Sequence, residues 1–70
     1  MTTPEERTRA VLKTREFLVA LASAARTPDV PEIVRQCAET LLRYYPEFAD
    51  MAIAHSACPH WFGDPSGEKK

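Results

Sequence analysis

Apolar residues recur along most of the chain at intervals of three and four positions, which is the spacing of one face of an α-helix. Three stretches have this pattern, and each follows a proline placed where a helix can begin. Proline suits the first turn of a helix and disrupts its interior, because its ring fixes φ and removes the backbone N–H donor. The pattern predicts an all-α protein, a small bundle of about three helices over residues 4–25, 31–45 and 46–57.

The start of the first helix has the strongest local signal. Thr3 offers a hydroxyl N-cap, Pro4 takes the first helical position, and Glu6 supplies the carboxylate of a capping box. Neither glycine nor proline interrupts the chain from there until Pro28. We therefore expect a helix to about Ala25. The apolar face expected of it consists of Ala10, Thr14, Phe17, Leu18, Leu21 and Ala25.

Pro31 opens the second predicted helix, and Pro46 ends it and begins the third, because a proline ring pushes the preceding residue out of the helical region. Pro59 and Gly63 rule out regular structure beyond residue 57. We expect residues 1–63 to form one helical domain and residues 64–70 a disordered, frayed polar tail. The expected apolar faces are Ile33, Val34, Cys37, Ala38, Leu41 and Leu42 on the second helix, and Phe48, Met51, Ala52 and His55 on the third.

The length of 70 residues limits what the protein can do. A core of this size supplies about 3–5 kcal/mol unless a disulfide, a metal or a partner adds to it. Hydrophobic residues make up 44% and charged residues 27%, as in ordinary globular proteins. We therefore expect a folded chain that gains from association, without a deep catalytic pocket.

The net charge of −1 provides no general attraction to nucleic acid or to an anionic membrane. The charge is uneven: residues 1–26 carry five positive and three negative side chains, and residues 27–57 carry two positive and five negative. No apolar run approaches the roughly 20 residues of a membrane span, and no signal-peptide pattern is visible. These features predict a cytoplasmic protein whose cysteines, Cys37 and Cys58, are free thiols.

The segment Cys58–Gly63 places two large aromatic rings, Trp61 and Phe62, just after the last predicted helix. In one interpretation the segment packs back and the rings close the open end of the bundle, because each ring buries about 150–250 Å². In the other, the rings stay partly exposed and anchor a partner, as aromatic residues often do at interfaces.

Metal binding is a weaker hypothesis. His55, Cys58 and His60, with Cys37 from the second helix, are the nitrogen and sulfur donors that zinc accepts. The chain lacks a Cys-x-x-Cys pair, however, and Cys37 falls among positions expected in the core. We therefore expect no metal and no other cofactor.

The sequence contains no recognisable set of catalytic residues either. The nearest nucleophile is Cys58 beside two histidines, with nothing to form an oxyanion site. The Glu5 and Glu6 pair is explained by helix capping, and the only glycines, Gly63 and Gly67, form no phosphate-binding loop. We predict that the protein is not an enzyme.

The alternative function is nucleic-acid binding, because the second helix, the Tyr45–Pro46 turn and the third helix resemble a helix-turn-helix unit. Residues 47–57 nevertheless contain no lysine or arginine. A regulator of this kind would have to use the basic face of the first helix, which carries Arg7, Arg9, Lys13 and Arg15. On these grounds we rank nucleic acid below a protein partner.

Three short phrases carry a family resemblance: Thr14–Leu18 (TREFL), Leu41–Pro46 (LLRYYP) and Pro59–Gly63 (PHWFG). Taken in order, they cover most of the chain, which resembles a family of short uncharacterised bacterial proteins. The resemblance implies a small helical bacterial protein, and it transfers no site residue.

The sequence thus favours a small protein-protein interaction module: an adaptor, inhibitor or regulator that binds another protein or a copy of itself. A marginal core gains stability from association, and the uneven charge can orient a partner. Adjacent helical residues point about 100° apart, so one tyrosine of the Tyr44–Tyr45 pair should face solvent. The candidate partner-binding residues are Trp61, Phe62, Tyr44, Arg15 and Arg43.

Overall fold

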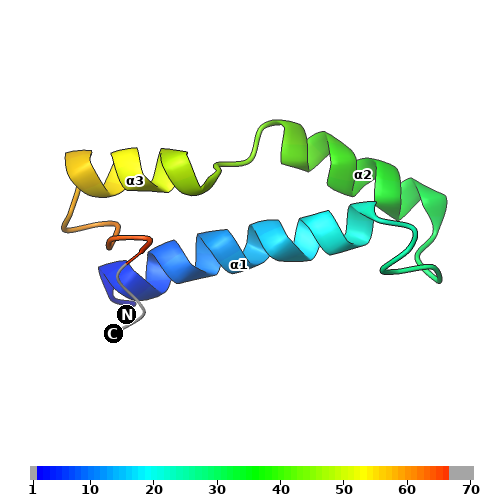
Figure 1. Cartoon of the computed structure of the whole chain (residues 1–70), viewed down its shortest axis with the longest axis horizontal. Helices are drawn as coiled ribbons and strands as arrows, with labels where there is room; N and C mark the ends of the chain where they lie inside the picture. Colours follow the sequence, from blue (N-terminus) through cyan, green and yellow to red (C-terminus); the bar gives the residue numbers. More distant parts are fainter. Residues whose placement is uncertain (1, 67–70) are drawn as a thin grey trace. The chain divides into compact units, whose positions relative to one another are not determined.

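The computed structural model describes residues 2–66, and its regular structure is entirely helical (Figure 1). Three helices follow one another: α1 (Pro4–Ala22), α2 (Glu32–Arg43) and α3 (Phe48–Ala57). No strand occurs between residues 2 and 66. The predicted all-α class and the number of helices are confirmed.

The residues group into two compact units, which we describe separately. The terminal unit combines the chain up to Lys13 with the chain from Pro46 onward. The central unit runs from Thr14 to Tyr45. Helix α1 therefore contributes its first part to the terminal unit and its second part to the central unit.

The predicted capping box begins α1. The backbone N–H of Glu6 donates to Thr3 Oγ1 (3.1 Å), and the backbone N–H of Thr3 donates to Glu6 Oε1 (2.9 Å). The helix ends at Ala22, three residues before the predicted end. The reason is a side chain: the Thr27 hydroxyl lies 2.7 Å from the carbonyl oxygen of Ala20 and 2.9 Å from that of Ser23. It takes over the helix-terminal carbonyls that another turn would have used.

Both other helices are shorter than predicted. Helix α2 stops at Arg43, where Tyr44 and Tyr45 donate their backbone N–H groups three residues back in a tight turn. Helix α3 begins at Phe48 rather than Pro46, because Glu47 is extended (φ −101°, ψ 177°) and acts as the N-cap. Its backbone N–H donates to Asp50 Oδ2 (2.8 Å), so this helix has a capping box that the sequence interpretation missed.

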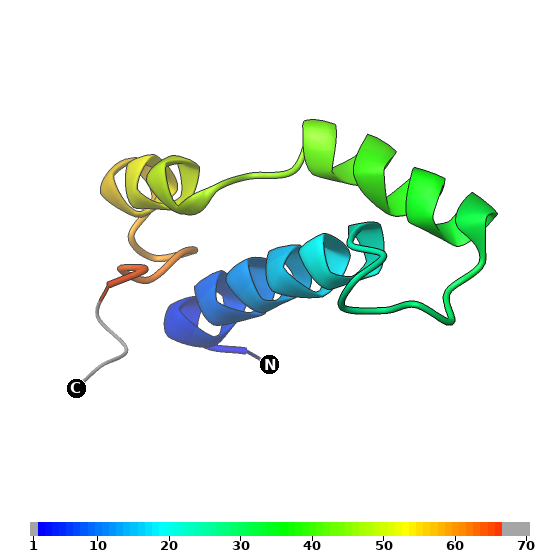
Figure 2. The ribbon, with the colours of Figure 1, turned by 45° about the vertical axis from the view of Figure 1, so that its right-hand side comes forward.

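In the terminal unit, the segment after α3 returns to the first turns of α1, as both ribbon views show (Figures 1 and 2). The backbone N–H of Gly63 donates to the Pro4 carbonyl (2.9 Å), and the Thr8 hydroxyl donates to the Gly63 carbonyl (2.9 Å). Thr8 is 2% exposed, and Met51 of α3 is also buried. The prediction that the C-terminal segment packs back is confirmed, although the segment makes these hydrogen bonds with the backbone of Gly63 rather than with its aromatic rings.

Residues 64–66 of the expected tail lie within the described part of the chain. Asp64 Oδ1 accepts hydrogen bonds from the backbone N–H (3.0 Å) and the hydroxyl (2.8 Å) of Ser66, and Pro65 between them is buried. The remainder of that tail, residues 67–70, lies outside the described residues.

In the central unit, residues 23–31 connect α1 to α2 through turns (Figure 2). Leu18 of α1 and Ala38 of α2 are buried, and so is the charged side chain of Arg35. Its guanidinium donates to three backbone carbonyls: Leu21 (2.9 Å), Thr27 (3.0 Å) and Val30 (3.2 Å). Because α1 has no basic residue in its last turn, Arg35 supplies the positive charge at that helix end from the neighbouring helix.

The predicted apolar faces are largely wrong. Of the residues assigned to them, only Leu18, Ala38 and Met51 are buried, and Leu21, Leu42 and His55 are half-buried. Exposed instead are Ala10, Thr14, Phe17, Ala25, Ile33, Val34, Cys37, Leu41, Phe48 and Ala52. Two buried positions belong to Thr8 and Arg35, because both satisfy backbone carbonyls that would otherwise lack a donor.

Candidate protein-binding surface

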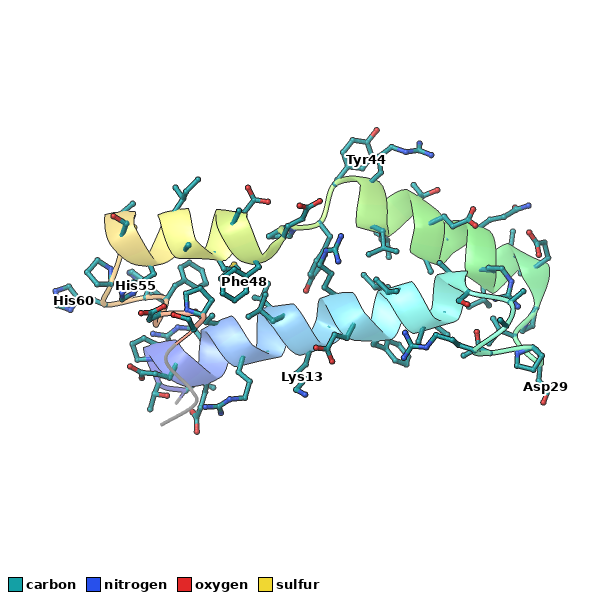
Figure 3. All side chains as sticks on the ribbon, in the orientation of Figure 1. Lys13, Asp29, Tyr44, Phe48, His55 and His60 are labelled. Atoms are coloured by element: carbon teal, nitrogen blue, oxygen red, sulfur yellow. The ribbon has the colours of Figure 1, made fainter. Side chains whose placement is uncertain are left out.

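One side of α2 carries a continuous set of exposed apolar side chains. Ile33, Cys37 and Leu41 are spaced four residues apart, so they share a face, and Tyr44 continues it just past the helix end. Ile33 is 67% exposed, Leu41 56% and Tyr44 80%, and Cys37 is exposed as a free thiol. Figure 3 shows the Tyr44 ring projecting away from the ribbon. We call these four residues the α2 apolar face.

The opposite side of α2 is what anchors the helix in its unit. Ala38 is buried there, and Arg35 reaches from it to the end of α1 and to the connection. Glu32 lies 3.7 Å from Arg35 Nε, and its own carboxylate remains mostly exposed. These interactions hold α2 by one side and leave the α2 apolar face turned to solvent.

Charged residues avoid the α2 apolar face. At 100° per residue, the helix places Glu32, Glu39 and Arg43 about 120–160° around its axis from Cys37. Glu32 lies in the first turn and Arg43 in the last, so the two ends of α2 have opposite charges. The α2 apolar face is therefore uncharged, and α2 carries an acidic residue in its first turn and a basic residue in its last.

Two of the predicted partner-binding residues belong to this region, and three do not. Tyr44 lies on the α2 apolar face, and Arg43, which is exposed, precedes it. Arg15 is half-buried on α1 in the central unit. Trp61 and Phe62 belong to the terminal unit, so the five residues do not form one surface within either unit.

Trp61 forms part of a second exposed feature. Trp61 is 63% exposed, and the Arg7 guanidinium lies 5.0 Å from the centroid of its ring, within cation–π range. Arg7 also donates to the carbonyls of Trp61 (2.7 Å), His60 (3.3 Å) and Thr2 (2.8 Å). The interpretation in which both rings close the open end of the bundle is therefore wrong for Trp61, which is mostly exposed, whereas Phe62 is half-buried.

The candidate zinc donors are committed to other interactions or face solvent. His55 Nδ1 donates to the Phe62 carbonyl (2.9 Å), which ties the imidazole to the C-terminal segment. Cys58 and His60 are exposed, and Figure 3 shows His60 pointing outward. Among residues 2–66, no group of three or more His, Cys, Asp and Glu side chains is arranged to hold a metal ion.

The proposed basic face of α1 is divided by the fold. Arg7 donates its hydrogen bonds within the terminal unit, and Arg15 is half-buried. Arg9 and Lys13 are exposed. No observation therefore strengthens the nucleic-acid hypothesis.

None of the described helices combines the length and the apolar character that a bilayer crossing requires.

The sequence interpretation missed both the α2 apolar face and Arg35. The signal was available for the face: apolar residues from Ile33 to Leu42 span about 180° of the helix, wider than the roughly 100° stripe that packing against a core requires. Half of such a sector must remain uncovered when one side of the helix is packed. For Arg35 no local signal existed, because its acceptors lie 5 to 14 residues away in the sequence.

Comparison of the chain with protein-family models, curated proteins and solved structures finds no match.

Proposed function

We propose that the protein is a small, non-enzymatic protein-protein interaction module that binds its partner through the α2 apolar face. One observation carries the proposal: Ile33 and Leu41 on one side of α2, and Tyr44 just past its end, are 67, 56 and 80% exposed. Contiguous exposed apolar residues mark interaction sites on small proteins, because water-exposed apolar surface is unfavourable unless a partner covers it.

The spacing of these residues supports the same function. Helices that bind in apolar grooves present side chains at intervals of three, four and seven residues. Ile33, Cys37, Leu41 and Tyr44 follow this spacing over the whole length of α2. Arg43, one of the residues expected to contact a partner, is exposed next to Tyr44.

The role we propose is that of an adaptor, inhibitor or regulator acting in the cytoplasm of a bacterium. Both cysteines are free thiols, which suits a reducing compartment. Trp61, held by Arg7 in the terminal unit, is a further candidate contact.

A pair of matched variants tests the surface. Ile33 on α2 and Ile53 on α3 are both exposed isoleucines of helices, at 67% and 68%. We expect a tagged wild-type protein and the Ile53→Glu variant to retain the same bound protein from the host, and Ile33→Glu to lose it. Circular dichroism should show equal helix content in all three. Equal retention by Ile33→Glu, or recovery of nucleic acid alone, would overturn the proposal.

A further inference from the structure

We draw no further inference here: the strongest candidate, the α2 apolar face of Ile33, Cys37, Leu41 and Tyr44, is the surface already described, and nothing in the structure shows what covers it.

Discussion

Replacing Arg35 with methionine should destabilise the central unit more than the replacement of any other charged residue in that unit. Methionine keeps the unbranched apolar stem but removes the donors to the carbonyls of Leu21, Thr27 and Val30. The Arg35 side chain is 9% exposed, so solvent screens these interactions little. A hydrogen bond that involves a charged group contributes about 1.5–3 kcal/mol to stability when its partner would otherwise be exposed to water.

The net loss is smaller than the sum, because water can reach part of the connection once the guanidinium is gone. Residues 24–26, 28 and 29 are already exposed. We expect a net loss of about 2–3 kcal/mol. Apolar replacements of buried ion pairs can be neutral when both partners are removed, but here the backbone carbonyls stay behind without their donor. Against a total stability of about 3–5 kcal/mol, the effect is large.

Thermal unfolding followed by circular dichroism measures this effect. A loss of this size lowers the Tm by about 10–20 °C in a domain of this length. Arg35→Lys, which keeps the charge but not the forked donors, should fall between methionine and wild type. Arg26→Ala in the same connection is the control and should change stability by less than about 0.5 kcal/mol, since Arg26 is exposed. An Arg35→Met variant as stable as wild type would refute the reasoning.

The remaining predictions concern the terminal unit. A Cβ at Gly63 would lie 2.8 Å from Glu5 Cα, so Gly63→Ala should lower stability by about 1–3 kcal/mol, measured by urea unfolding. Thr8→Val removes the buried hydroxyl that donates to the Gly63 carbonyl and should cost about 1–2 kcal/mol in the same assay. Arg7→Ala should make the emission of Trp61, the only tryptophan, more accessible to acrylamide, because the guanidinium covers one face of its ring.

Ser56→Ala on the exposed side of α3 is the control for these variants and should leave stability within about 0.5 kcal/mol of wild type. A Gly63→Ala variant as stable as wild type would mean that the C-terminal segment does not approach α1 this closely. Unchanged quenching in Arg7→Ala would show that the guanidinium does not shield the ring.

What the sequence determined by itself was local. Thr3, Pro4 and Glu6 act within one helical turn, so the start of α1 was predictable. Pro46 indicated a break between the second and third helices, although α2 already ends at Arg43, and the 3.6-residue periodicity indicated the helical class. Such signals act between neighbouring residues, so they do not depend on which helices pack together.

Tertiary structure alone decided which side of each helix is buried. Ile33 and Ala38 belong to one apolar sector, and only the placement of a neighbouring segment leaves the first exposed and covers the second. Arg35 is buried only because the end of α1 and the connection lie within reach of its guanidinium. Burial depends on contacts between residues distant in the sequence, and for a chain this short a single neighbour decides the face that remains for binding.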